Sequence, residues 1–294
     1  MLTIEPGTIP TADFHQYMLG AVAPRPIAFA STVDKEGNPN LAPYSFFNCF
    51  SSNPPILVFS SNRKVEGNTT KDTLHNVMET GEVVINVVTY AIVRQAAVAG
   101  IEFPKEMSEF AKTGLTPIAS DLVKPYRVKE SPVQMECKLK EIIPLGEQGG
   151  AGHLIICEIV KMHIDEAILD ENGRIDPHKI DLMGRMGRAY YVRASGEAIH
   201  TIVQPQNRMG IGYDNLPESI RKSNILTGND LGQFAGMPAA PTFEMIQTLQ
   251  NDIYIQSLLQ LKNPIEELHR YAQKELAKEN LELAAQIAWL GEHL

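Results

Sequence analysis

The stretch Ala23–Asn48, with the sequence APRPIAFASTVDKEGNPNLAPYSFFN, decides the fold of this 294-residue chain. An apolar run, Ile27–Val33, leads into a turn-rich cluster, and a second apolar run covers Leu41–Phe47. Two strand-like runs around a loop with glycine and asparagine predict a β-hairpin. The second run ends in aromatic residues that alternate with small polar ones. Such a strand end suits a flat ring, which it can stack on and hydrogen-bond at the edge.

Further strand-like runs follow the hairpin. We expect strands at Ile56–Ser60, Val83–Val88, Val133–Ile143 and His153–Ile164. A short helix near Thr11–Phe14 should end before Pro24. Many short strands with few helices between them favour a mainly β fold, with a barrel or sandwich core, over a doubly wound sheet.

The polar loop after Ile56–Ser60 leads to one predicted helix. Thr70 or Asp72 is expected to cap its start, and Gly81 to end it. The residues 51–55 are expected to form a turn or loop because they contain two prolines.

The composition changes after about residue 205. From Phe243 onward the apolar residues have helical spacing, and Pro264 is well placed to start a helix. The predicted organisation is a β-barrel domain, residues 1–210, followed by an α-helical C-terminal extension, residues 211–294, packed on the barrel or on a dimer of it.

Composition and motifs exclude several function classes. The net charge of −9, with no Lys/Arg cluster, argues against nucleic-acid binding. Cys49, Cys137 and Cys157 form no CxxC pair and the histidines no HxH or HExxH motif, so neither a metal site nor a disulfide scaffold is expected. Free thiols and the lack of a signal peptide favour the cytoplasm. No apolar run approaches the roughly 18 residues that a membrane span needs.

An anion site is predicted at the start of the helix that Gly81 ends. Lys71, Asp72 and Thr73 open this helix, and Arg63 lies in the preceding loop. Helix N-termini offer unpaired N–H groups and a favourable dipole to a phosphate. The alternative interpretation is that these residues are helix caps and solvated charges.

Ser45, Phe46, Phe47 and Asn48 are the second candidate group. Because side chains alternate along a strand, only one of the two phenylalanines can enter the core. The other needs a ligand, a helix or another subunit as its partner. His153 is a tentative catalytic residue, although a lone histidine is more often structural.

These residues, in this order, resemble the flavin reductase-like family of FMN-binding split β-barrel proteins, and within it the flavoredoxin-like branch. The segments that carry the resemblance are Pro24–Ala28, Asn40–Asn48, Pro54–Pro55, Lys71–Thr73 with Asn76, Ser131–Val133 with Glu136–Cys137, and Gly152–His153. The resemblance implies a Greek-key split barrel, a homodimer, and FMN bound near the dimer interface.

The resemblance also implies roles for the site residues. Ser45, Phe46, Phe47 and Asn48 would meet the isoalloxazine ring. The ribityl chain and the phosphate would be held by Ser60, Ser61, Asn62, Arg63, Lys71, Asp72 and Thr73. His153 would lie near the flavin or the nicotinamide. No role is transferred to the segment Met183–Tyr191, which has Arg185 and Arg188 among its glycines, nor to the C-terminal helices.

Three functions remain open at this point. The leading one is an FMN-binding oxidoreductase, most simply a flavin reductase with NADH or NADPH as electron donor. The second is an FMN-containing electron carrier that serves a redox partner protein. The third is a cofactor-free interaction protein whose helical extension binds a partner. A flavin carries the redox chemistry itself, so the first two require no protein nucleophile.

Overall fold

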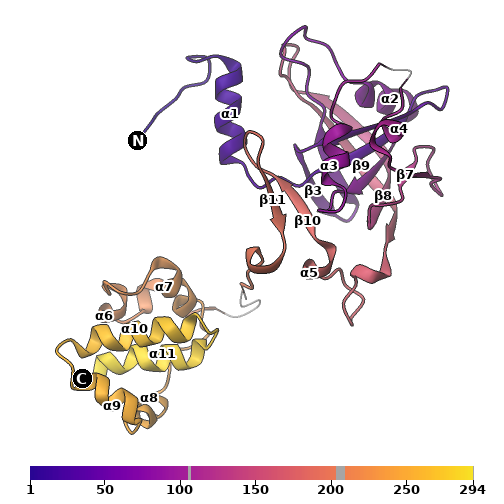
Figure 1. Ribbon diagram of the computed structural model, residues 1–294. Helices are drawn as coiled ribbons and strands as arrows, with labels where there is room; N and C mark the ends of the chain where they lie inside the picture. The colour runs from indigo at the N-terminus through magenta and orange to yellow at the C-terminus, as the bar shows by residue number, and fades with distance from the viewer. Residues whose placement is uncertain (105–106, 203–208, 294) are drawn as a thin grey trace. The chain divides into compact units, whose positions relative to one another are not determined.

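The computed structural model describes residues 1–104, 107–202 and 209–293 (Figure 1). The chain divides into two compact units, Met1–His200 (unit 1) and Thr201–Leu294 (unit 2). Unit 1 contains all the strands of the described residues and every candidate site residue. Unit 2 is helical. The packing of the C-terminal helices on the barrel or on a dimer of it stays a prediction.

A seven-stranded antiparallel sheet organises unit 1. Its spatial order is β2 (Pro39–Tyr44), β1 (Ala28–Val33), β5 (Glu82–Val87), β8 (Val133–Pro144), β9 (His153–Ile164), β4 (Pro55–Ser60) and β3 (Phe47–Ser52). The two edge strands, β2 and β3, are joined by only two residues, Ser45 and Phe46. So short a link reaches roughly 10 Å, so the sheet must curl until its edges approach. No hydrogen-bonded ladder joins β2 to β3 within the described sheet.

The predicted β-hairpin is confirmed, and its tight turn has a local cause. β1 pairs with β2 from Ala28↔Tyr44 to Val33↔Pro39. Asp34 Oδ1 accepts hydrogen bonds from the N–H groups of Glu36 and Asn38, at 3.1 and 2.8 Å. Between them Gly37 takes a φ of 90°, which favours glycine.

The prediction of one continuous strand over Leu41–Phe47 is wrong. The chain leaves the sheet at Ser45 and re-enters it as β3 at Phe47. The break occurs because the Phe46 carbonyl accepts the Ser60 N–H at 2.8 Å, which switches the chain from its β1 partner to β4. β3 then continues to Ser52, so the predicted loop at 51–55 is shorter than expected.

Among its described residues, unit 1 also has five α-helices, two short 3-10 helices and two small ribbons. The 3-10 helices are Glu166–Ile168 and Gly196–Ala198. The α-helices and ribbons are α1 (Thr11–Ala21), α2 (Asp72–Thr80), α3 (Val93–Val98), α4 (Glu109–Thr113), α5 (Pro177–Ile180), the ribbon β6 (Pro117–Ile118) with β7 (Arg127–Val128), and the ribbon β10 (Leu182–Arg185) with β11 (Tyr191–Ala194). As predicted, α2 ends at Gly81, which has a φ of 69°. The predicted caps are wrong: Lys71 occupies the N-cap position and makes no side-chain capping bond.

The sheet is buried on both faces near β1. Ala28 and Ala30 face one cluster, which fills the inside of the curled sheet around Phe59 and Ile85. Phe29 faces a second cluster, in which residues of α3 and α4 cover the outer side. This layer of α3 and α4 lies over β2 and builds the walls of the two cavities described below.

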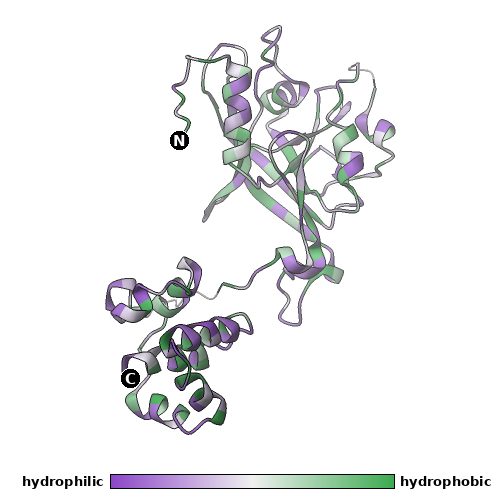
Figure 2. Cartoon of the chain, turned by 60° about the vertical axis from the view of Figure 1, so that its left-hand side comes forward, coloured by the Kyte–Doolittle hydropathy of each residue, from purple (hydrophilic) through white to green (hydrophobic). Residues whose placement is uncertain are grey.

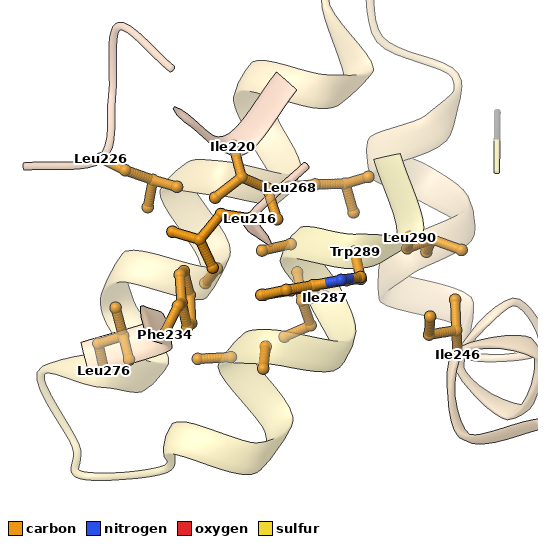
Figure 3. Packing of buried hydrophobic residues seen from close by; sticks show 14 of the residues in the cluster. Leu216, Ile220, Leu226, Phe234, Ile246, Leu268, Leu276, Ile287, Trp289 and Leu290 are labelled. Atoms are coloured by element: carbon orange, nitrogen blue, oxygen red, sulfur yellow. The ribbon is translucent and has the colours of Figure 1, made fainter. Parts of the chain in front are cut away.

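Unit 2 is a small helical bundle with its own core. Its helices are α6 (Glu218–Arg221), α7 (Gly228–Ala235), α8 (Phe243–Leu249), α9 (Ile253–Leu259), α10 (Pro264–Leu276) and α11 (Leu281–Leu290). Hydrophobic and hydrophilic residues are interleaved along α10 (Figure 2), as expected of a helix with one buried face. Phe234, Leu268 and Trp289 lie in the shared core (Figure 3).

The helix start at Pro264 is confirmed. The apolar stripe Met245–Leu258, by contrast, forms two helices, because the Asp252 carboxylate accepts the N–H groups of Tyr254 and Ile255 and starts α9 anew.

The large antiparallel sheet and the C-terminal helices are thus both confirmed, while the expectation of a mainly β chain is wrong. The fold is mixed, because unit 2 and α1–α5 of unit 1 add extensive helix. Among the described residues, no helix has both the length and the apolar character that a membrane crossing requires.

Candidate functional site

A cavity of about 250 Å³ opens at the start of α2; we call it the α2 pocket. Strand β2 contributes Tyr44 to its wall, and the first residues of α2 contribute Thr73. The remaining lining residues are Asn40, Ala42, Pro43, Lys64, Thr70, Lys71, Asp72, Ala99, Gly100, Ile101, Glu102, Phe103 and Glu109. Of the four residues of the predicted anion site, Lys71, Asp72 and Thr73 line this cavity and Arg63 does not.

Two buried hydroxyl groups beside this pocket have no hydrogen-bond partner. They belong to Tyr44 and Ser61. Burial raises the pKa of Tyr44 to about 12, although the nearby hydroxyls of Thr73 and Ser61 act in the opposite direction. A buried hydroxyl left without a partner costs roughly 1–3 kcal/mol. An acceptor oxygen bound in this pocket would satisfy such donors, so the residues present fit a phosphate.

Lys71 brings a positive charge to the same place. Its Nζ lies 5.3 Å from the centre of the Tyr44 ring. Burial lowers the pKa of Lys71, and the charge of Lys64 adds to the effect while Glu102 opposes it. None of the ion pairs between described residues involves Lys71. A bound anion would supply the missing counter-charge.

Carboxylates also line the α2 pocket, and two of them already have partners. Glu102 pairs with Lys64 at 2.6 Å. Glu109 accepts the backbone N–H of Leu41 at 3.1 Å, and burial raises its pKa. Among the described residues that line the pocket, Lys71 is therefore the cation without an ion-pair partner.

The structure places Ser60, Ser61, Asn62 and His153 next to one another. Ser60 Oγ donates to Asn62 Oδ1 at 2.7 Å. Ser61 and His153 exchange backbone hydrogen bonds at 3.1 and 3.2 Å, and His153 Nδ1 also lies 3.2 Å from the Ser61 carbonyl. The glycine before His153 allows this approach, because a Cβ at Gly152 would lie 2.5 Å from Ser60 Oγ. The Ser61 hydroxyl lies near that of Tyr44, which places this group beside the α2 pocket.

Arg63 lies elsewhere. Its guanidinium donates to the side chain and the carbonyl of Asn68, at 2.6 and 2.7 Å, and it is not among the residues that line the α2 pocket. Lys64, one residue later, does line it. The arginine therefore shapes the loop before α2 instead of contributing to the pocket wall.

The four residues at the predicted ring site point to different neighbours. Phe47 packs on the core inside the sheet. The ring of Phe46 meets that of His15 on α1 edge-on, with centroids 6.0 Å apart. Of the three partners that the sequence left open for this phenylalanine, a ligand, a helix or another subunit, the structure shows a helix. Asn48 is exposed, and its Oδ1 accepts the N–H of Cys49. Ser45 lines a second, smaller cavity on the other side of Pro43.

Part of the α2 pocket is formed by residues that no sequence pattern singles out. Tyr44 was in the decisive stretch, but nothing local showed that its hydroxyl would be buried without a partner. Glu109 and the residues 99–103 carry no motif, and they reach the pocket because α3 and α4 pack over β2.

Comparison with known proteins decides the family. The model of the family described as "Flavin reductase like domain" matches residues 19–180, more than half of the chain. The chain belongs to this family. The match lies within unit 1 and includes every candidate residue of the α2 pocket; unit 2 lies outside it.

Individual relatives agree with this assignment. An uncharacterized protein of Aquifex aeolicus (strain VF5) is 43% identical over 184 residues, which cover 62% of this chain and 91% of that protein. Nitrilotriacetate monooxygenase component B from Bacillus cereus is 35% identical, with a TM-score of 0.63, over 68% of this chain and 98% of its own. Pseudomonas fluorescens 2-nitrobenzoate 2-nitroreductase NbaA is 28% identical, with a TM-score of 0.61, over 70% of this chain and 100% of its own. These similarities support a flavin-related oxidoreductase.

The unpartnered hydroxyl of Tyr44 gives this flavin reductase-like unit a testable property. We expect Tyr44→Phe to leave the free energy of unfolding of the ligand-free protein unchanged or to raise it by up to about 1 kcal/mol, because the change removes a buried donor without a partner. The same change should weaken the binding of inorganic phosphate. Thermal melts with and without phosphate measure both effects. A clear loss of stability without phosphate would show that the hydroxyl has a structural partner.

Proposed function

We propose that unit 1 binds FMN and that the chain is an oxidoreductase that reduces this flavin with NADH or NADPH. The observation that carries the proposal is the α2 pocket at a helix start, within a chain of the flavin reductase-like family. Lys71, without an ion pair among the described residues, and the unpartnered hydroxyl of Tyr44 line it, and the unpartnered hydroxyl of Ser61 lies beside it. In this proposal the phosphate lies in the α2 pocket and the isoalloxazine ring near Ser45–Asn48.

The residues would divide the work by their chemistry. Lys71 would pair with the phosphate charge, and the hydroxyls of Tyr44, Ser61 and Thr73 would donate to its oxygens. Ser60, Asn62 and His153, held together by the hydrogen bonds described above, would face the ribityl chain and the ring. Bound FMN supplies the hydride acceptor, and the protein supplies position and electrostatics. The Greek-key split barrel and a homodimer with FMN near its interface belong to the same proposal.

Titration of the purified chain with FMN, followed by absorbance and fluorescence, tests the proposal. FMN should bind at least tenfold more tightly than riboflavin, which lacks the phosphate. Stopped-flow mixing with NADH and NADPH then tests the donor. Bleaching of the flavin by either nucleotide supports a flavin reductase, and no bleaching with both favours the electron carrier. A protein that binds no FMN would refute both functions.

Lys71→Ala sharpens this test. Loss of a hydrogen bond to a charged group should weaken FMN binding by about 10- to 100-fold and leave riboflavin binding unchanged. Lys129→Ala is the control, because Lys129 is exposed and lies outside the α2 pocket. Arg63→Ala should have a smaller effect than Lys71→Ala, since Arg63 is bound to Asn68. Equal losses for FMN and riboflavin would place the phosphate elsewhere.

A further inference from the structure

Two arginines of unit 1 lie directly opposite each other, and neither has a counter-charge among the described residues. Arg25, before β1, and Arg185, at the end of β10, form an isolated antiparallel bridge with backbone hydrogen bonds of 2.9 and 2.8 Å. Like charges directly opposite each other in a sheet are destabilising. Burial lowers the pKa of Arg25, and the nearby charge of Arg185 lowers it further.

The hydrogen-bond partners of both arginines are neutral. Arg25 is buried and donates to the carbonyls of Leu19, Val22 and Met186, and its Nε lies 3.4 Å from Ser45 Oγ. Arg185 donates to the Tyr190 carbonyl, and its guanidinium lies 4.6 Å from the centre of the Tyr191 ring. Neither arginine takes part in any ion pair between described residues.

An arginine on the other strand of the β10–β11 ribbon shows the contrast. Arg193, on β11, binds the carboxylate of Asp181 through two hydrogen bonds of 2.7 and 2.8 Å. The ribbon therefore carries one arginine with a bidentate carboxylate partner and one, Arg185, that lacks it.

Arg185 lines a cavity of about 90 Å³ on the outer side of the sheet, which we call the Arg185 pocket. Ser45 and Tyr191 add a hydroxyl and an aromatic ring to its wall, and Ile27, Val88 and Val93 make much of the rest apolar. Pro43 separates it from the α2 pocket, since Pro43 lines both. The cavity thus combines an apolar wall with one open guanidinium.

We propose that the Arg185 pocket binds the carboxylate of a small organic acid, with the apolar part of the ligand against Ile27, Val88 and Val93. The planar guanidinium fork matches a carboxylate, and one negative charge balances the guanidinium that has no counter-ion. A phosphate dianion fits less well, because it carries more oxygens and more charge than this wall can match. Besides Arg185, the described wall offers only the hydroxyls of Ser45 and Tyr191. Ser45 also belongs to the proposed ring site, so the carboxylate would lie beside the flavin; this last step rests on the proposed function.

Benzoate is the probe, and its neutral isostere benzamide is the comparison. Isothermal titration of the full chain without flavin should show benzoate binding at least tenfold more tightly than benzamide. Arg185→Gln should weaken benzoate binding by about 10- to 100-fold, the range for one charged hydrogen-bonding partner, and leave benzamide unchanged. Arg188→Gln is the matched control: Arg188 is exposed and lies three residues further on, outside the pocket.

Ala97→Leu gives a second variant that keeps both arginines. Ala97 is exposed and lines the pocket, so a larger side chain there should obstruct benzoate without disturbing the core. Thermal melts check that each variant folds. Equal affinities for benzoate and benzamide, or equal effects of the two arginine variants, would overturn the proposal.

The same titrations with FMN separate this proposal from the proposed function. Benzoate and FMN should bind together, and Arg185→Gln should leave FMN binding unchanged. Competition between the two ligands would overturn the proposal, because the pocket would then be part of the flavin site. A chain that binds benzoate but no FMN would support the carboxylate site and refute the flavin function.

Discussion

Phe234→Ala is expected to unfold unit 2 or bring it close to unfolding, and to leave unit 1 folded. Phe234 on α7 is fully buried and meets the ring of Trp289 on α11 edge-on, with centroids 5.5 Å apart (Figure 3). Truncation of a buried phenylalanine costs about 3–5 kcal/mol. A unit of fewer than 100 residues has a total stability of the same order.

The unfolding of unit 2 can be measured separately from that of unit 1. Trp289 is its single tryptophan, so the fluorescence in a urea titration reports on unit 2. Phe243→Ala is the control, because Phe243 on α8 is 59% exposed and should cost less than about 1 kcal/mol. FMN binding, proposed for unit 1, should survive in both variants. If Phe234→Ala abolishes flavin binding at 25 °C, the two units do not fold independently.

The sequence predicted those elements whose causes are local. The apolar run Ile27–Val33 placed β1, and Gly81 ended α2 because the αL conformation favours glycine. The break at Ser45–Phe46 has no local cause. It depends on the N–H of Ser60, which lies 14 residues from Phe46, so the apolar run Leu41–Phe47 was interpreted as one strand.

The same distinction applies to the site. Lys71, Asp72 and Thr73 follow each other at one helix start, and the sequence brought them together correctly. Arg63 and Lys64 differ in role because Asn68, with a φ of 49°, turns to accept the arginine. Which of two adjacent cations reaches the pocket is therefore set by a loop conformation that no spacing rule specifies.

Tertiary packing also creates sites that motifs do not reveal. Arg25 and Arg185 are 160 residues apart in the sequence, and only the bridge between them shows that two positive charges meet. Glu136 is a further case, because its partners come from a loop before β8 and from β9.

Glu136→Gln is expected to lower the free energy of unfolding of unit 1 by about 3 kcal/mol at pH 7. The Glu136 side chain on β8 is fully buried. Its Oε1 accepts the N–H of Asp121 at 2.9 Å and its Oε2 the N–H of Leu122 at 2.6 Å, and Oε1 also lies 2.7 Å from His163 Nε2. An amide in this position has one acceptor oxygen fewer, so a buried donor loses its partner.

The pH dependence of the stability difference shows whether the negative charge of Glu136 is responsible. Burial alone would raise the pKa of Glu136, but hydrogen bonds from Asp121, His163 and Leu122 outweigh it and hold the pKa below its ordinary value of 4.5. A carboxylate with a lowered folded-state pKa stabilises the fold above pH 4.5, and this contribution is lost as the pH falls through the folded-state value. The difference between wild type and Glu136→Gln should therefore shrink below pH 4.5.

Amide hydrogen exchange of β8 and β9 measures this difference within unit 1. Glu141→Gln is the matched control, because Glu141 lies on the same strand with its side chain exposed. Its effect should stay within about 0.5 kcal/mol at every pH. If Glu136→Gln instead destabilises unit 1 equally at pH 7 and pH 3.5, the loss comes from packing, and the carboxylate charge does not hold the loop at Asp121 and Leu122.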